Sequence, residues 1–294
     1  MRRVLLTGIL AAVGVAALLG SCSAAAPAVW DPLGLFSLNE KVGVVEITGL
    51  ISRSTPTLDE LKSFREDKRI RALVIRVNSP GGAVGPSQEI MEEINKTKKV
   101  KKVVVSCGSL AASGGYYIAS AADLIMASPG SAIGSIGVIM QLANVEALTK
   151  KLGVDFFSLK AGALKDMGSP FKPLTPEERA VFQSLLNNIH EQFIKDVAKN
   201  RKLPVEKVRA LADGRVFTGQ EGKDLGLVDA LGNFNDAVEK AGRLGGIKGK
   251  IETVYPEKKG FSLLRLFLGE DAEKNLEFLT SPSPEPAFLP PWFR

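Results

Sequence analysis

Apolar runs divide the middle of this chain into short strands and helices. Three β-branched runs, at residues 42–47, 73–77 and 103–106, have the length and composition of buried strands. Apolar residues recur at helical spacing in the segments between them, 57–68 and 86–96. Because strands alternate with helices, we predict an α/β fold with a mainly parallel sheet, whose functional loops follow the carboxyl ends of the strands.

The same pattern continues along the chain. We expect a helix at 144–152 and strands at 124–126, at 155–159 and from residue 134. A longer helix, ending near Arg201, is predicted to begin at Thr175. There the sequence Thr-Pro-Glu-Glu supplies a capping hydroxyl, a proline at the first helical position and a glutamate three residues after the cap.

The N-terminal segment is not predicted to belong to this fold. Arg2 and Arg3 precede a largely apolar run of 16 residues, Val4–Leu19, which is the pattern of an export signal. The run is shorter than the roughly 20 residues of a membrane-spanning helix. It ends in Leu-Gly-Ser-Cys22, which resembles a bacterial lipobox. We therefore predict lipidation of Cys22, with an uncleaved signal anchor as the alternative; both imply export and attachment to a membrane.

These patterns divide the chain into four parts. They are a signal sequence or anchor at 1–26, a linker at 27–41, a folded domain at 42–245, whose bounds are those of the family resemblance described below, and a C-terminal extension with a proline-rich tail at 246–294.

Composition narrows the function mainly by exclusion. Hydrophobic residues make up 45% of the chain, enough for a substantial core. The net charge of +6 is spread along the chain, and its densest lysine run, at 96–102, has no nucleic-acid motif beside it. Two cysteines do not make a disulfide framework, and one histidine leaves no Cys/His cluster. We predict no nucleic-acid partner, no metal and no cofactor.

Two stretches carry candidate chemistry. The first, GSLAASGGYY at 108–117, follows one predicted strand and precedes a segment of small residues that can form a helix. A strand, tight turn and helix would present Ser113 as a nucleophile, with the N–H of Gly114 facing the developing oxyanion. A glycine-rich helix start packed against a strand is the alternative. The second stretch, Asn-Ser-Pro-Gly-Gly at 78–82, ends another strand, and its glycines allow backbone N–H groups to point outward.

Together these stretches resemble the Clp protease/crotonase superfamily. GSLAASGGYY itself resembles the signal peptide peptidase A (SppA) family of membrane-bound serine proteases, and the resemblance extends over residues 42–245. It implies a ββα spiral with a single catalytic domain. It also implies that Gly82 and Gly114 supply the oxyanion donors.

The same resemblance implies a lysine base. The single histidine, His190, lies inside the predicted long helix, and Gly137-Val138 occupies the region where Clp proteases carry theirs. Lys165-Asp-Met-Gly-Ser-Pro170 matches the family's lysine motif, so Lys165 would accept the proton of Ser113. Burial among apolar neighbours would help it to do so, because burial favours a neutral amine. Ser135 matches a serine that orients this lysine; a capped turn is the alternative reading.

The resemblance implies a membrane-tethered serine endopeptidase that degrades remnant signal peptides and other small, apolar-rich peptides. Its location would be the bacterial cell membrane, with the catalytic domain on the extracytoplasmic side. The family also implies a homo-oligomeric ring of about eight subunits, in which neighbours share their sites. A crotonase-fold acyl-CoA enzyme and a non-catalytic, stomatin-associated scaffold are the alternatives.

Overall fold

The structure is a computed structural model that describes residues 40–256 and 287–288. The predicted export signal, Cys22 and most of the proline-rich tail lie outside the described residues. The chain divides into two units, Met1–Leu38 and Asn39–Arg294, and the sheet with its helices belongs to the second.

In the described part of the chain, one sheet contains eight strands in the order β7-β6-β4-β2-β1-β9, with β5 pairing to β4 and β8. Every pairing in it is parallel except that of β6 with β7. The strands are β1 (Lys41–Thr48), β2 (Ile70–Ser79), β4 (Lys102–Ala112), β5 (Leu124–Ala127), β6 (Ala132–Gly134), β7 (Val216–Thr218), β8 (Ala230–Leu231) and β9 (Glu252–Val254). The predicted α/β fold with a mainly parallel sheet is confirmed.

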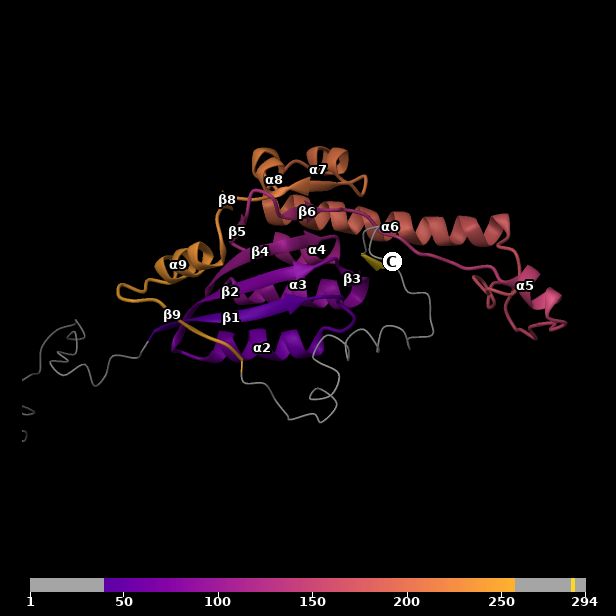
Figure 1. Ribbon diagram of the computed structural model, residues 1–294, viewed down its shortest axis with the longest axis horizontal. Helices are drawn as coiled ribbons and strands as arrows, with labels where there is room; N and C mark the ends of the chain where they lie inside the picture. The colour runs from indigo at the N-terminus through magenta and orange to yellow at the C-terminus, as the bar shows by residue number, and fades with distance from the viewer. Residues whose placement is uncertain (1–39, 257–286, 289–294) are drawn as a thin grey trace, which may run out of the picture. The chain divides into compact units, whose positions relative to one another are not determined.

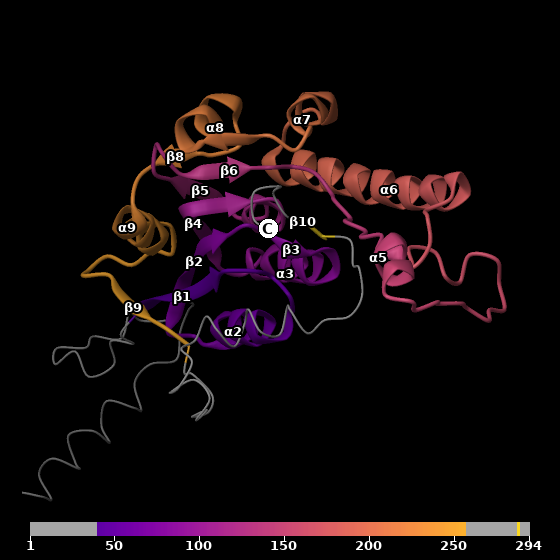
Figure 2. The same cartoon turned by 45° about the vertical axis from the view of Figure 1, so that its right-hand side comes forward.

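Both faces of the sheet are buried because alternate strand residues enter two different cores. On one side, α2 (Thr55–Glu66), α3 (Val84–Thr97) and α4 (Gly114–Ser120) cover β1, β2 and β4, and α6 (Pro176–Arg201) packs against α4. On the other side lies α9 (Phe234–Leu244). Figure 1 and Figure 2 show these two layers of helices and, beside them, α7 (Val205–Leu211) and α8 (Gly219–Leu225).

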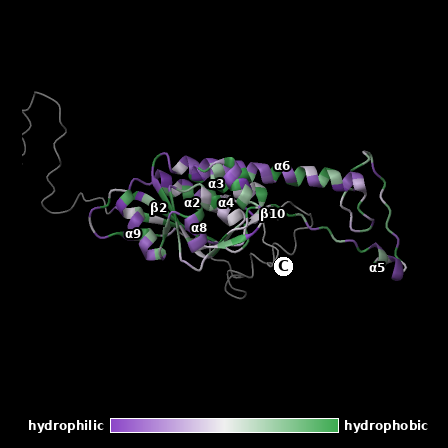
Figure 3. Ribbon diagram, turned by 90° about the horizontal axis from the view of Figure 1, so that it is seen from above, coloured by the Kyte–Doolittle hydropathy of each residue, from purple (hydrophilic) through white to green (hydrophobic). Residues whose placement is uncertain are grey.

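The long helix predicted from Thr175 is confirmed, with its capping box in place. Only the second half of α6 contributes apolar side chains to the core. Earlier in the helix, Val181 and Leu185 are exposed, and Figure 3 shows hydrophobic colour on this part of α6 away from the sheet. Among the described residues, no helix combines the length and the apolar character needed to cross a bilayer.

Two strand predictions are wrong. Residues 155–159 form no strand; the segment is exposed, and it pairs with no strand in the part of the chain that the structure describes. The strand expected to start at residue 134 instead ends there, as β6, because Ser135 turns the backbone into the left-handed region. In addition, β9 lies beyond the predicted boundary at residue 245 and extends the sheet beside β1.

Candidate active site

Ser113 stands between the end of β4 and the start of α4. Its backbone has φ 52° and ψ −118°, a conformation that costs energy for residues other than glycine and recurs at active sites. Two hydrogen bonds hold it there: its N–H donates to the Gly134 carbonyl at 2.7 Å, and its carbonyl accepts from the Tyr117 N–H at 2.8 Å. Ser113 is 1% exposed, and its Oγ has no hydrogen-bond partner among the described residues. A strained, buried hydroxyl without a partner is a candidate nucleophile.

The Asn-Ser-Pro-Gly-Gly stretch forms a fixed turn at the end of β2. Gly81 has φ 106°, which favours glycine. Ser79 Oγ accepts a hydrogen bond from the Gly81 N–H at 3.1 Å and donates one to the Gly49 carbonyl at 2.6 Å. The turn leads into the two-residue strand β3 (Gly82–Ala83) and then into α3.

Gly82 and Gly114 are neighbours beside Ser113. A methyl group on Gly114 would lie 3.2 Å from the Gly82 nitrogen and 2.7 Å from Ser87 Oγ, so the backbones approach as closely as glycine permits. Gly114 also opens α4, and the first N–H groups of a helix have no acceptors within it. The structure thus brings together both glycines that the family resemblance implies as oxyanion donors.

Ser135 lies at the same end of the sheet. β6 pairs in parallel with the end of β4, with Gly134 opposite Ala112, so Ser135 follows one strand as Ser113 follows the other. Ser135 is buried, has φ 51° and donates its N–H to the Arg215 carbonyl at 2.8 Å. Two adjacent parallel strands are therefore each followed directly by a buried serine with positive φ.

Lys165 does not join this group within one chain. It lies on the arm, by which we mean residues 139–175 between β6 and α6. Figure 1 and Figure 2 show the arm, including α5 (Glu146–Lys151), extending beyond the strand ends before it returns to α6. Lys165 is exposed. His190 does not contact Ser113 Oγ either: its own buried Nε2 lacks a hydrogen-bond partner in the described part of the chain.

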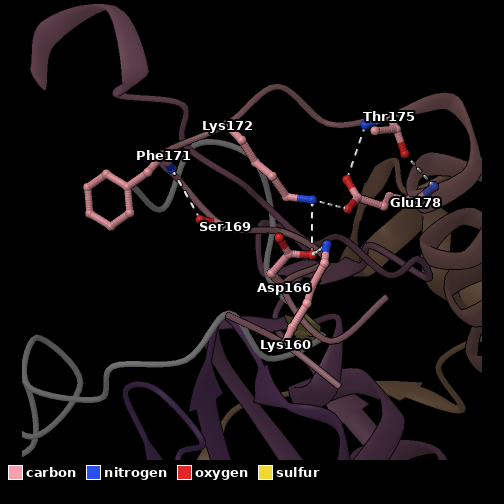
Figure 4. Close-up of polar contacts among 7 residues, drawn as sticks. All are labelled: Lys160, Asp166, Ser169, Phe171, Lys172, Thr175 and Glu178. Carbon is pink, nitrogen blue, oxygen red and sulfur yellow. Dashed lines mark hydrogen bonds and ion pairs between the residues drawn. The ribbon is translucent and has the colours of Figure 1, made fainter. Parts of the chain in front are cut away.

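The sequence reasoning missed an ion-pair cluster around the lysine turn. Asp166 accepts from Lys160 at 2.5 Å and from Lys172 at 3.2 Å, and Lys172 also bonds Glu178, the glutamate of the Thr175 capping box (Figure 4). The hydrogen bond from Lys160 lowers the pKa of the Asp166 carboxyl, and that from Lys172 lowers the pKa of Glu178. The capping box was the available signal, because it fixes where Glu178 lies.

The described residues contain no group of three histidine, cysteine, aspartate or glutamate side chains that would hold a metal. Cys107, on β4, is buried, and burial raises the pKa of its thiol to about 12. It is therefore a small core residue and not a reactive thiolate.

Residues 95–248 match the sequence profile of Peptidase family S49. This segment contains Ser113, Ser135 and Lys165, and Gly82 lies just before it. The protein belongs to peptidase family S49. Its motif resemblance to the SppA family is thereby confirmed, together with the α/β Clp/crotonase-like fold that the resemblance implied.

Three relatives show how far this likeness extends. The S49 chain is similar to a putative protease from Synechocystis sp., with 42% identity over 81% of this chain and 86% of the relative. It is 40% identical to a putative signal peptide peptidase SppA from Enterococcus faecium, over 62% of this chain and 53% of that protein. It is 33% identical to the chloroplastic serine protease SPPA of Arabidopsis thaliana, over 70% of this chain and 32% of that protein. The chain is an SppA-type serine peptidase.

Proposed function

We propose that this serine peptidase is an endopeptidase that works through an acyl-enzyme on Ser113. Ser113 Oγ attacks the peptide carbonyl while the Lys165 amine takes the proton and passes it to the leaving amine. Gly82 and Gly114 donate N–H groups to the oxyanion, and water then hydrolyses the acyl ester with Lys165 again as base. The main support for this proposal is Ser113 itself: its backbone is strained, its hydroxyl is buried without a hydrogen-bond partner among the described residues, and it lies beside the two glycines.

The edge of β3 supports a peptide substrate. β10 (Ala287–Phe288) pairs antiparallel with β3, placing Phe288 opposite Gly82 and Ala287 opposite Ala83. An extended chain can therefore form a backbone ladder next to the proposed oxyanion glycine, which is how many proteins bind peptides. We propose that remnant signal peptides and other small, apolar-rich peptides bind along this edge.

We further propose that the site is shared between subunits. Ser113 is buried at the strand ends, whereas Lys165 is exposed on the arm. The arm also exposes apolar side chains that a neighbour would cover; Phe157 is 86% exposed and Leu159 is 94% exposed. A head-to-tail contact of this kind must close into a ring to avoid filaments, and a ring of about eight subunits fits the SppA resemblance. In this arrangement Ser135 of the serine-bearing subunit orients the incoming Lys165.

The proposed location follows from the N-terminus. Its export signal and Cys22 imply a chain tethered to the bacterial cell membrane, with its catalytic domain on the extracytoplasmic side. Signal peptides remain in that membrane after cleavage, so a tethered peptidase would meet them there.

Complementation tests the shared site. Ser113→Ala and Lys165→Ala should each be inactive alone, and co-expression should restore part of the activity, because mixed rings place some intact serines beside intact lysines. Each variant expressed alone at the same total level is the control. No restoration in assembled mixed rings would show that each chain carries its own complete site.

A fluorophosphonate probe tests the serine itself. It should label the wild-type protein, and Ser113→Ala should abolish the labelling. A non-catalytic scaffold or a crotonase-type acyl-CoA enzyme, which has no activated serine, would show no Ser113-dependent labelling.

A further inference from the structure

Of three lysines near the proposed catalytic turn of the arm, two form ion pairs and the third, Lys165, does not take part in them. Lys160 and Lys172 both donate to the carboxylate of Asp166, at 2.5 Å and 3.2 Å. Lys172 also bonds Glu178, whose side chain is only 3% exposed. Two ammonium groups and two carboxylates thus form a neutral cluster, drawn in Figure 4. Lys165 is outside it, although it directly precedes the residue at the centre of the cluster.

The backbone around Lys165 is a tight turn. The Lys165 N–H donates to the Gly162 carbonyl at 3.1 Å, and the Ser169 N–H donates to the Asp166 carbonyl at 3.1 Å. Gly168, with φ 78°, packs so closely that a methyl group there would come within 3.0 Å of the Phe182 ring on α6. Because the bond from Lys172 to Glu178 reaches the first turn of α6, the cluster ties this turn to the start of the long helix.

We infer that Asp166 is a positioning residue for Lys165. Its side chain, 15% exposed, fastens the lysine turn through Lys172 to the capping box of α6, while its main chain leads directly into Lys165. The pairing also neutralises Lys160 and Lys172, which leaves Lys165 as the lysine of this turn outside the cluster. This inference rests on the proposed role of Lys165 as base.

The geometry explains why such fastening matters. A flexible lysine side chain on a long arm reaches the serine of a neighbour only if the arm itself holds a fixed direction. Catalysis is sensitive to placement, and a displacement of about 1 Å at a reacting group costs about 100-fold in rate. Releasing the turn should therefore slow the chemical step more than it weakens substrate binding.

Asp166→Asn in the full-length, detergent-solubilised protein is the test, because asparagine keeps the shape and removes the charge. We expect kcat on a synthetic signal peptide to fall about 10- to 100-fold, with KM, melting temperature and oligomeric state unchanged. Asp166→Glu should recover part of the loss, since the longer carboxylate still reaches an ammonium. Glu191→Gln is the matched control: it breaks the ion pair that joins Glu191 on α6 to Arg209 on α7, away from the cluster, and should leave kcat unchanged.

A double-mutant cycle separates positioning from independent effects. The kcat of the double variant Asp166→Asn/Lys172→Gln should be no lower than that of Asp166→Asn alone, because each change breaks the same link, the ion pair between Asp166 and Lys172. If Asp166→Asn does not fold, Lys160→Gln/Lys172→Gln tests the same cluster from its other side and should lower kcat without raising KM.

The possible outcomes separate the positioning role of Asp166 from the proposed role of Lys165 as the base. Wild-type kcat in Asp166→Asn or in the double lysine variant, with Lys165→Ala inactive, overturns the positioning role alone. An active Lys165→Ala overturns the lysine base and the positioning role together. A loss of activity in Asp166→Asn that follows a fall in melting temperature or in oligomer content, with kcat per assembled subunit unchanged, means that the cluster is only a structural brace and also overturns the inference.

Discussion

Replacing Gly82 with alanine should abolish most activity and leave the protein folded. A Cβ on the native backbone would lie 2.1 Å from the Ile51 carbonyl oxygen, and such contacts are not seen below 3.0 Å. The backbone must therefore move by about 0.9 Å (3.0 − 2.1). Ile51 is hydrogen-bonded to Gly81 and Ala83, on either side of Gly82, at 2.9 Å and 2.8 Å, so separating Gly82 from Ile51 strains both bonds and displaces the turn that carries the Gly82 N–H.

A displacement of that size takes the Gly82 N–H out of reach of the oxyanion. Loss of one such donor lowers kcat by about 10²- to 10³-fold, or about 2.7–4 kcal/mol of transition-state stabilisation. The assay is kcat and KM on a synthetic signal peptide, with the melting temperature measured in parallel. Gly85→Ala is the matched control: it lies in α3 with no atom within 4 Å of the added methyl, and alanine is the better helix former. A folded Gly82→Ala with kcat within about threefold of wild type would refute the oxyanion assignment.

Three further predictions concern the base, the membrane tether and the acid stability of the fold. Lys165→Ala and Lys165→Arg should both be inactive, since arginine does not give up its proton, whereas His190→Ala should keep most of its activity. The kcat/KM of the wild-type enzyme should rise with pH, because only a neutral amine accepts the serine proton. A flat profile from about pH 5 to about pH 10 would contradict a lysine base. Cys22→Ala should prevent lipid labelling by radioactive palmitate in cells; a wild-type protein that takes up no label would favour the uncleaved anchor. Hydrogen bonds from Arg69 lower the pKa of Asp67 to about 2, below the value near 3.9 of an unfolded chain, so its contribution to the free energy of unfolding is present above about pH 4 and is lost as the pH falls towards 2. Asp67→Asn should flatten that part of an acid titration followed by urea unfolding, and an unchanged slope would count against the pairing.

The sheet and the serine turn were open to prediction because each depends on local sequence. The β-branched runs of β1, β2 and β4 are buried on both faces, so their composition alone marks them as strands. Around Ser113, glycine and alanine are required where backbones touch, as at Gly114 against Gly82. The left-handed conformation of Ser135 was not foreseen, since serine carries no mark of a positive φ and tertiary hydrogen bonds impose it.

The arm resisted prediction for a different reason. The ion pairs around Asp166 join residues six apart in a loop, as in Lys160 with Asp166, where no helical or strand period reveals a contact. The failed strand at 155–159 is more informative. Apolar residues there, among them Phe157 and Leu159, have the pattern of a buried segment, yet they lie exposed in the single chain. The hydrophobic pattern of a segment reflects the contacts that the segment makes in the assembled protein, and in an oligomer some of these contacts come from other subunits. The wrong prediction therefore agrees with the proposal that a neighbouring subunit covers the arm and receives its lysine.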